Sequence, residues 1–408
     1  MKKNFSELSY YLTKEIDKTV KKNMGIFFTP IKTIKKTYEV LNSKIKNIKT
    51  ILEPSCGSCE YIKYFIENYN HKDVHITGIE LNKAIYNEII KKKFHNTNII
   101  NANFIEWETD KKYDLIIGNP PYFVMKKKEI NKKYYTMFDG RPNIFMLFII
   151  KSLKLLNENG YLSFILPKNF MNSLYYDKLR RYIYDNYKIY DIIDCSDDKY
   201  IETQQDTIIF IIQKIKKKSK KNNNKFIVNN KNKYTIFNTK ENIVKINKLY
   251  YNATNLNDLG FNVKVGNIVW NQCKDILTNN SIDTRLIYNS DIVNNKLSIK
   301  KYKNKDKKNY INKEGKTGIL LVLNRGYGTG KYSFDYCLID TKEPYLIENH
   351  LICIESKTDI DNNILKEKYT KIINSWNNKK TKEFIKLYFS NNAINTTELQ
   401  YILPIYIT

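Results

Sequence analysis

Short apolar runs alternate with amphipathic segments over the first half of the chain. Apolar residues every three or four positions predict helices, and short continuous apolar runs predict buried strands. The predicted helices cover residues 6–22, 31–41, a segment from the turn at 54–58 to about 69, a segment after 82, 144–156 and 174–186. The predicted strands cover residues 50–53, 75–80, 98–101, 113–118, 161–166, 189–194 and 207–213. This alternation predicts an α/β fold with a doubly wound, mostly parallel, seven-stranded sheet.

The pattern changes after residue 213. Residues 214–225 are rich in Lys and Asn without any periodicity, which predicts a solvated loop or linker. Farther on, short irregular strands and loops predict a second domain of the α+β class. The expected parts of the chain are a first domain at 1–213 with a helical extension at 1–24, a linker region at 214–240 and a second domain at 241–408.

Composition adds a preference for polyanionic partners. The 408 residues include 69 Lys and Arg against 42 Asp and Glu, a formal net charge of +27. This excess favours nucleic acid before a membrane surface. The alternative is that an AT-rich coding genome enriches Lys, Asn and Ile without any nucleic-acid role. Charge therefore supports a DNA or RNA partner without identifying it.

No run approaches the roughly 20 apolar residues of a membrane span, and the N-terminus lacks the apolar core of a signal peptide. Six cysteines in a chain of this length do not make a disulfide framework, so we expect an intracellular, reducing location. Cys56 and Cys59 form a C-x-x-C pair, but the remaining cysteines stand apart and only four histidines exist. We therefore expect no metal site.

One turn points directly to chemistry. A predicted strand ends in Gly118-Asn119-Pro120-Pro121-Tyr122, and two prolines stop a sheet because each fixes its φ at about −65°. The stiff turn presents the Asn119 amide, the Pro120 carbonyl and the Tyr122 ring to one small volume. Carbonyl acceptors beside an aromatic face suit a planar substrate with an exocyclic amino group.

Two acidic residues are expected at the same edge of the sheet. Glu53 ends the first strand and precedes a small-residue turn, while Glu80 ends the second strand. An acidic residue there can accept hydrogen bonds from ribose hydroxyls, although it is more often a helix cap or a surface group. The turn lacks the G-x-G-x-x-G spacing of a dinucleotide site, which disfavours NAD and FAD.

The order of these motifs resembles one enzyme family. Residues 28–30, 52–57, 78–80, 102–104 and 119–122 follow one another as in the S-adenosylmethionine-dependent DNA adenine-N6 methyltransferases of the TaqI type. The similarity covers about residues 25–213. It implies a class I methyltransferase fold, S-adenosylmethionine as cofactor, double-stranded DNA as substrate, and restriction–modification as one expected setting.

The resemblance assigns cofactor contacts residue by residue. The residues concerned are Phe28, Thr29, Pro30, Glu53, Pro54, Ser55, Cys56, Gly57, Glu80, Leu81, Asn103, Phe104 and Asn119. Thr29 and Pro30 would contact the methionine end, and Glu80 would hold the ribose hydroxyls.

The adenine ring of the cofactor would lie between Leu81 and Phe104. Ordinary core positions are the alternative for both residues. The family usually has an acidic residue at the position of Asn103, where it binds the adenine amino group. An uncharged amide implies weaker cofactor binding in this chain.

The resemblance also implies the catalytic residues. The Asn119 side-chain oxygen and the Pro120 carbonyl would accept the two N–H groups of adenine N6 and expose the nitrogen lone pair, without a strong general base. An adenine inside a duplex must first be flipped out. Tyr122 would stack on one face and Tyr200 on the other, at about 1–3 kcal/mol per base. Since the chain has 33 tyrosines, chance is the alternative for Tyr200.

The second domain resembles target-recognition domains only loosely, around residues 263–268 and 320–330. Arg325 and Tyr327 lie in a glycine-rich loop that would either enter a DNA groove or be a mere flexible loop. Two other functions stay open: an RNA adenine or protein glutamine methyltransferase with the same turn, and a non-catalytic DNA-binding protein. We expect a monomer, with a dimer as the alternative.

Overall fold

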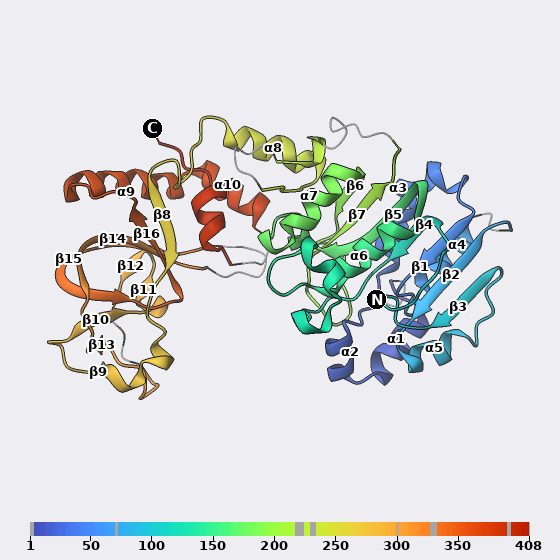
Figure 1. Ribbon diagram of the computed structural model, residues 1–408, viewed down its shortest axis with the longest axis horizontal. Helices are drawn as coiled ribbons and strands as arrows, with labels where there is room; N and C mark the ends of the chain where they lie inside the picture. Colours follow the sequence, from blue (N-terminus) through green and yellow to red (C-terminus); the bar gives the residue numbers. More distant parts are fainter. Residues whose placement is uncertain are drawn as a thin grey trace. The chain divides into compact units, whose positions relative to one another are not determined.

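The computed structural model describes residues 4–69, 72–216, 224–228, 234–298, 300, 302–326, 333–389 and 393–407 (Figure 1). The chain divides into two compact units. Unit 1 comprises Met1–Asn229 and Tyr234–Ile243, and unit 2 comprises Asn230–Lys233 and Val244–Thr408. No helix among the described residues is both long and apolar enough to cross a membrane.

Unit 1 is built on a seven-stranded sheet in the order β3-β2-β1-β4-β5-β7-β6. Its strands are β1 (Thr50–Glu53), β2 (His75–Glu80), β3 (Thr97–Asn101), β4 (Tyr113–Gly118), β5 (Leu156–Pro167), β6 (Lys188–Asp194) and β7 (Thr207–Gln213). Neighbouring strands from β3 to β5 pair in parallel, and β7 runs antiparallel between β5 and β6. The predicted α/β class with a mostly parallel sheet is confirmed.

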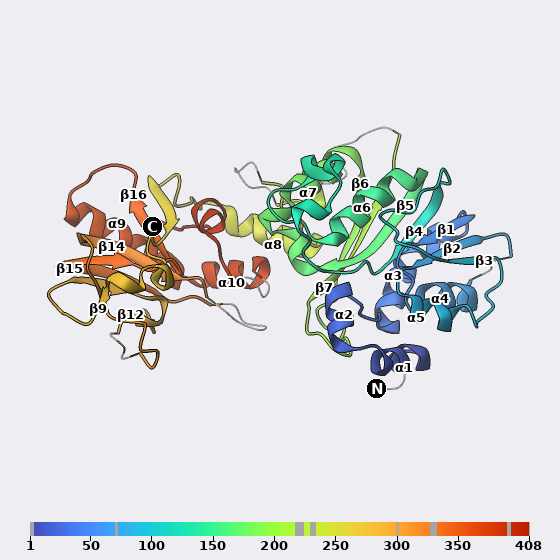
Figure 2. The same cartoon turned by 60° about the horizontal axis from the view of Figure 1, so that its bottom comes forward.

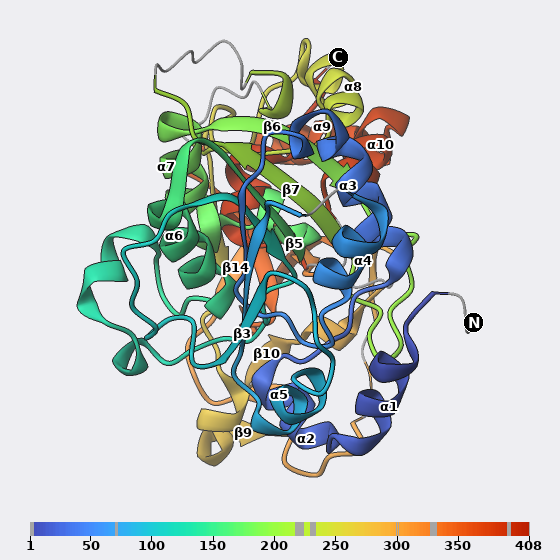
Figure 3. The same cartoon turned by 90° about the vertical axis from the view of Figure 1, so that its right-hand side faces the viewer.

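Helices cover both faces of this sheet. The helices that begin in unit 1 are α1 (Glu7–Glu15), α2 (Lys18–Met24), α3 (Ile31–Ile45), α4 (Glu60–Asn68), α5 (Lys83–Ile89), α6 (Ile144–Leu155), α7 (Asp177–Asn186) and α8 (Lys240–Tyr250). Figure 3 shows α6 and α7 on one side of the sheet and α3 and α4 on the other. Figures 1 and 2 show α1 and α2 near the carboxyl ends of the parallel strands.

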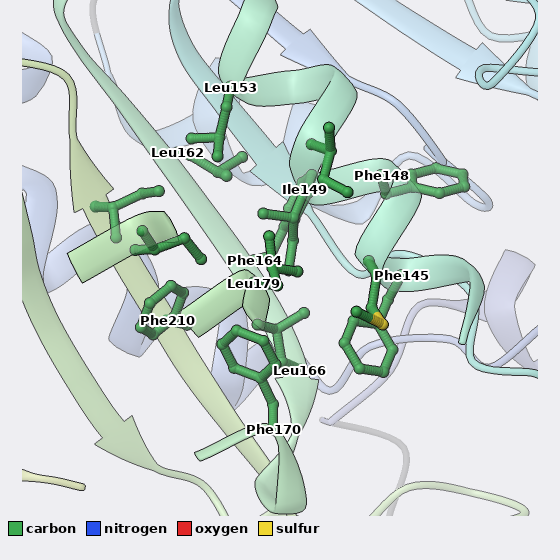
Figure 4. Packing of buried hydrophobic residues seen from close by; sticks show 14 of the residues in the cluster. Phe145, Phe148, Ile149, Leu153, Leu162, Phe164, Leu166, Phe170, Leu179 and Phe210 are labelled. Carbon is green, nitrogen blue, oxygen red and sulfur yellow. The ribbon is translucent and has the colours of Figure 1, made fainter. Parts of the chain in front are cut away.

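The strands bury both faces because their apolar residues are consecutive. In β4, Leu115 and Ile117 belong to the core shared with α3 and α4, whereas Ile116 belongs to the core shared with α6. Figure 4 shows Phe145 and Ile149 of α6 beside Phe164 of β5 in this second core. Two-sided burial of a central strand removes a large apolar area from water and fixes the register of the sheet.

The N-terminal helix predicted over residues 6–22 is wrong in one respect, because the segment forms two helices. Ile16 is extended, and the Asp17 side chain accepts hydrogen bonds from the backbone N–H groups of Thr19 at 2.7 Å and Val20 at 3.2 Å. Asp17 therefore caps a new helix, α2, in the middle of an apolar pattern that looked continuous. Gly25, with a φ of +64°, ends α2.

Part of the region expected as a linker packs into unit 1. Phe226 and Phe237 are fully buried in the core on the α6 side, and the Phe237 ring stacks on Phe210 of β7 with centroids 5.8 Å apart. Their apolar side chains stand between Lys- and Asn-rich stretches, so burial outweighs the polar composition of their surroundings. Residues 217–223 and 229–233 lie outside the described part of the chain.

Unit 2 contains a mixed seven-stranded sheet in the order β8-β16-β14-β15-β10-β13-β9 and a separate β11-β12 pair. The strands are β8 (Phe261–Val265), β9 (Leu277–Thr278), β10 (Thr284–Ile287), β11 (Ile292–Val293), β12 (Lys296–Leu297), β13 (Tyr310–Ile311), β14 (Lys316–Asn324), β15 (Tyr336–Ile347) and β16 (Leu351–Ser356). Helices α9 (Asn362–Asn377) and α10 (Lys379–Tyr388) complete it. The Tyr369 hydroxyl of α9 donates to the Ile354 carbonyl at 2.6 Å, which ties α9 to the sheet. The predicted α+β class is confirmed for unit 2.

Candidate active site of unit 1

The parallel strands of unit 1 place the predicted motifs along one edge. Strands β1, β2 and β4 end at Glu53, Glu80 and Gly118, and β1 pairs with both of the others. The residues that follow these ends line one pocket, which opens where ligands bind in folds of this type. The predicted residues that line it are Phe28, Pro54, Ser55, Gly57, Glu80, Leu81, Asn103, Phe104 and Asn119.

Glu80 is buried at this edge, with a side chain held by the backbone. Its Oε2 accepts from the Gly57 N–H at 2.9 Å, and its Oε1 accepts from the Asn82 N–H at 2.7 Å. Burial raises the pKa of Glu80 to about 7, although these backbone N–H groups oppose the rise. Each carboxylate oxygen keeps a further lone pair, so the ionised side chain can accept two hydroxyl groups of a ligand.

The residues expected around the cofactor adenine also lie in this pocket. Phe104 is almost fully buried and packs against Phe148 with ring centroids 5.0 Å apart, whereas Leu81 is 54% exposed. Both residues line the pocket, and an exposed leucine together with an aromatic ring suits a flat apolar group of a ligand. The Asn103 side-chain oxygen accepts from the Ile105 N–H at 3.1 Å, so one of its two lone pairs is already used.

Three further predicted residues, Thr29, Glu53 and Cys56, line a small adjoining cavity. Burial raises the pKa of Glu53 well above its usual range, and its Oε2 has no hydrogen-bond partner among the described residues. A buried carboxyl oxygen without a partner is costly and suits a ligand that brings a donor or a positive charge.

Pro30 does not lie with these residues. It lines none of the three unit 1 cavities considered in this section and instead precedes α3, where its carbonyl accepts from the N–H groups of Thr33 and Ile34. The cofactor contact expected for Pro30 stays a prediction, and the fixed φ of this proline suits the start of a helix.

Cys56 and Cys59 form a turn between β1 and α4. Both thiols are free and buried, and the Cys59 N–H donates to the Cys56 carbonyl at 2.7 Å. Within the described ranges, no group of three or more His, Cys, Asp or Glu side chains could hold a metal ion. The pair shapes the backbone below the pocket.

Asn119 begins the turn that follows β4. Gly118 has a φ of +152°, which favours glycine and lets the chain turn sharply before Asn119. The Asn119 carbonyl accepts from the Ser55 hydroxyl at 3.1 Å, which joins the turn to the loop after β1. The segment before α3 approaches from the other side so closely that a Cβ on Gly25 would lie 2.7 Å from the Tyr122 backbone nitrogen.

A second cavity adjoins the first at this turn. Asn119, Gly25 and Phe27 line both cavities. The second cavity is also lined by the remaining predicted catalytic residues, Pro120, Tyr122 and Tyr200, together with Thr203, Gln205 and Thr207. The four residues predicted to handle the substrate base therefore lie together in the structure.

Tyr200 lies in a loop that two N-terminal helices hold in place. The buried Asp198 side chain accepts from the Thr33 hydroxyl at 2.9 Å and from the Lys36 ammonium at 2.8 Å. The Lys21 ammonium lies 2.8 Å from the Glu202 carboxylate. These contacts fix the loop on both sides of Tyr200 and so determine where its ring stands.

The residues present fit S-adenosylmethionine. Glu80 offers acceptors for ribose hydroxyls, Leu81 and Phe104 give the same pocket an apolar lining for a flat ring, and Glu53 offers a buried acceptor in the adjoining cavity. Asn119 stands at the junction with the second cavity.

Sequence reasoning missed several lining residues. Phe123, Ile144 and Phe148 line the first cavity, and Thr203 and Gln205 line the second. The helix over 144–156 was predicted, but the pattern alone does not tell which of its apolar residues faces a ligand. Thr203 and Gln205 lie in an irregular loop without any periodic signal.

The predictions for the second domain remain largely open. Arg325 follows β14 and is exposed, whereas Tyr327 and residues 328–330 lie outside the described residues. Residues 263–268 include the end of β8, an edge strand of the unit 2 sheet. The DNA-recognition role of unit 2 stays a prediction.

Comparisons with known proteins agree with this site. Residues 1–201 match the family described as Eco57I restriction-modification methylase. The type II methyltransferase M.CvrRI of Paramecium bursaria Chlorella virus XZ-6E is 26% identical over 404 residues, 96% of this chain and 97% of that protein. The modification methylase CviBIII of Paramecium bursaria Chlorella virus NC1A is 32% identical over 183 residues, 44% of this chain and 47% of that protein.

A solved structure of a type I restriction-modification methyltransferase subunit from Streptococcus thermophilus covers 54% of this chain and 53% of its own, with 16% identity and a TM-score of 0.40. The TaqI type and the adenine target stay predictions. The sequence-based prediction of an S-adenosylmethionine-dependent methyltransferase of the restriction–modification kind is therefore confirmed.

Proposed function

We propose that this protein transfers a methyl group from S-adenosylmethionine to the N6 amino group of an adenine flipped out of duplex DNA. The observation that carries the proposal is the position of Asn119 between two cavities. The first cavity fits the cofactor, and the second has an aromatic and carbonyl lining that fits a base. The net charge of +27 supports a nucleic-acid substrate.

The protein residues would act by position. The Asn119 Oδ1 and the Pro120 carbonyl oxygen would hold the two amino protons of the base, which directs the nitrogen lone pair toward the first cavity. When bound, S-adenosylmethionine supplies a methyl group on a positively charged sulfur. Burial raises the pKa of Tyr122 and Tyr200 above the ordinary tyrosine value, so both rings stay neutral and serve as stacking surfaces.

Glu80 and Glu53 would bind the cofactor. Ionised Glu80 would accept the ribose hydroxyls, and Glu53 would gain its charge only when a cationic ligand group approaches, because burial holds its pKa high. Phe104 and Leu81 would exclude water from the adenine ring. Binding energy from these remote contacts would place the reacting methyl group next to Asn119.

A transfer assay with tritium-labelled methyl donor tests the proposal, with duplex DNA, RNA and total protein offered as separate acceptors. We expect label in duplex DNA and, after digestion, in N6-methyladenine. Label confined to RNA or to glutamine side chains would contradict the DNA proposal. Label in DNA cytosine would contradict the adenine proposal alone.

The variant Asn119→Ala tests the proposed mechanism in the same assay. We expect the rate of methyl transfer to fall at least about 1,000-fold. The substitution removes the Asn119 side-chain oxygen, which is one of the two acceptors that would bind and position the amino group of the base. DNA binding should remain, whereas cofactor affinity should fall because Asn119 also lines the first cavity. Full activity of this variant would exclude the proposed mechanism, and loss of DNA binding would point to a damaged fold.

A further inference from the structure

An asparagine can serve as an acceptor in this site only if its amide has the right orientation. The oxygen and nitrogen ends of an amide have nearly the same shape, but only the oxygen accepts a hydrogen bond. If Asn119 turned its nitrogen toward the second cavity, the amino group of a base would meet two N–H donors. The protein must therefore distinguish the two orientations of this side chain.

The nitrogen end of Asn119 is fully engaged. Its Nδ2 donates to the Phe27 carbonyl at 3.2 Å and to the Thr29 Oγ1 at 3.2 Å. An amide nitrogen has two protons, so these two acceptors use its whole donor capacity. Reversing the amide would place its oxygen against the Phe27 carbonyl oxygen, where no proton stands between them.

The oxygen end is held differently. The Tyr122 hydroxyl lies 2.8 Å from the Asn119 Oδ1 and 2.8 Å from the Ile165 carbonyl oxygen, and it has one proton to donate. An amide oxygen has two lone pairs, so Asn119 can accept from Tyr122 and still accept from a substrate. The orientation is therefore set at the nitrogen end, and acceptor capacity is kept at the oxygen end.

Thr29 is well placed for this role. Its side chain is only 6% exposed, and the next residue, Pro30, begins the turn into α3. Phe27 contributes a backbone carbonyl, so Thr29 is the side chain through which a substitution can test the orientation. The resemblance assigned Thr29 to the cofactor, but its hydroxyl contacts the catalytic amide.

We propose that Thr29 is a positioning residue that holds the Asn119 amide for the substrate amino group, in the orientation that the acceptor-only Phe27 carbonyl sets. The inference rests on the proposed function, because it assumes that Asn119 Oδ1 accepts from the substrate. It predicts that Thr29 acts on the rate of transfer and leaves the binding of DNA and cofactor unchanged. A cofactor contact at Thr29 would instead weaken cofactor binding.

The test compares Thr29→Val with Thr29→Ser in the full-length protein. Valine keeps the shape but removes the acceptor, so we expect kcat to fall about 10-fold, the effect of one hydrogen bond of about 1.4 kcal/mol. Serine keeps the acceptor and should retain kcat within about 2-fold of the wild type. The KM for DNA and the Kd for S-adenosylhomocysteine should stay within about 2-fold in both variants.

Thr37→Val is the matched control for loss of a buried threonine hydroxyl. Thr37 lies in α3 and lines none of the three cavities, and its hydroxyl donates to the Thr33 carbonyl at 3.1 Å and lies 3.4 Å from the Tyr61 hydroxyl. Thermal unfolding of all three variants separates loss of fold from loss of rate. We expect Thr37→Val to keep wild-type kcat.

Three outcomes would overturn the inference. These are unchanged kcat in Thr29→Val, an equal fall in Thr29→Ser, and a rise in the Kd for S-adenosylhomocysteine that accounts for the lost activity. Failure of the proposed function would look different, since the wild type itself would then put no label into DNA adenine. In that case, the same comparison applies to the acceptor that wild type does methylate.

Discussion

The two cavities that meet at Asn119 are built in different ways. The first lies over the ends of β1, β2 and β4, and its polar groups are held by backbone N–H groups of the turns that follow these strands. The second is closed by the loop around Tyr200, whose Asp198 and Glu202 side chains are held by Lys36 of α3 and Lys21 of α2. The edge of the sheet forms the first cavity directly, whereas side-chain contacts between a loop and two helices shape the second.

This difference predicts that substitutions can change cofactor binding and the handling of the substrate base separately. Substitutions around the first cavity should change cofactor affinity and leave DNA affinity alone, because their contacts come from the sheet edge. Substitutions around the second should change the handling of the base and leave cofactor affinity alone. Only the shared residues, Gly25, Phe27 and Asn119, should affect both.

After Asn119→Ala, the largest effect is expected from Gly25→Ala, which changes the wall that the two cavities share. Gly25 has a φ of +64°, and an added Cβ would lie 2.7 Å from the Tyr122 nitrogen, which is backbone and cannot move aside. We expect transfer activity to fall at least about 100-fold, since a displacement of about 1 Å in a catalytic turn has effects of this size. Steady-state kinetics at saturating DNA and cofactor measure it.

Gly260→Ala controls for backbone strain. Gly260 lies in unit 2 with a φ of +86°, and an added Cβ would have no atom within 4 Å. Both substitutions place alanine at a positive φ at a cost of about 1–2 kcal/mol, so the fall in the unfolding midpoint of Gly260→Ala measures the backbone strain without the clash. Equal activity of the two variants would show that the contact with Tyr122 does not matter.

The next largest effect is expected from Tyr200→Ala, which alters the second cavity and leaves the first unchanged. Loss of one stacking surface, at about 1–3 kcal/mol, should lower kcat/KM for DNA about 10- to 100-fold. Tyr200→Phe keeps the ring and should retain most of this activity. The Kd for S-adenosylhomocysteine, measured by calorimetry, should not change. A parallel loss of cofactor affinity would contradict the separation of the two cavities.

Glu80 should make cofactor binding depend on pH. Its pKa of about 7 means that the carboxylate becomes ionised as pH rises from 6 to 8, and the ionised form accepts ribose hydroxyls best. Affinity for S-adenosylhomocysteine should therefore rise about 5-fold across this range in the wild type. It should be weaker and nearly flat with pH in Glu80→Gln.

The raised pKa of Glu80 affects folding stability in the opposite direction, because rising pH lowers the stability of the cofactor-free protein. A carboxyl with a raised pKa in the folded state binds its proton more tightly there, so its contribution is fully present below the unfolded value of 4.5 and is lost as pH rises through about 7. Without cofactor, the free energy of unfolding of the wild type should fall more between pH 4.5 and about 7 than that of Glu80→Gln. A steeper pH dependence in Glu80→Gln would contradict the assignment.

The smallest effect is expected from Asn103→Asp, which restores the acidic residue usual in the family. A charged acceptor binds an amino group more strongly than a neutral amide does, by about 1 kcal/mol, so cofactor affinity should rise about 5-fold. The Asn103 oxygen already accepts from the Ile105 N–H, and an aspartate can keep that bond. Weaker binding in Asn103→Asp would show that the amide N–H group contacts the cofactor.

The sequence predicted unit 1 better than unit 2 for a physical reason. Strands such as Thr50–Glu53 and Tyr113–Gly118 are short apolar runs between turns, and these two pair in parallel. The alternation of such strands with helices along the chain is a local pattern that predicts a parallel sheet. The sheet of unit 2 depends on pairing between distant segments, as in the antiparallel pair of β8 with β16 and the parallel pair of β10 with β15. Such long-range pairing has no local sequence signal.

Within the site, residues in short motifs were predicted and residues in irregular loops were not. Glu80 and Asn119 directly follow or end apolar strands, so their place at the sheet edge follows from the pattern. Asp17 was missed because one acidic residue inside an apolar period looks like a solvent-facing position. Thr29 was named for a different contact, since its partner comes from a segment 90 residues away.

The position of β7 has a consequence for how the chain folds during synthesis. Its seven residues, Thr207–Gln213, fill the slot between β5 and β6, so the sheet stays split until residue 213 has left the ribosome. Until then, β5 and β6 expose unpaired apolar edges, which favour aggregation. A fragment that stops at residue 201 would keep the cofactor pocket residues but lack this strand. A shortened protein that contains unit 1 should therefore extend past Phe237, whose ring stacks on Phe210 of β7.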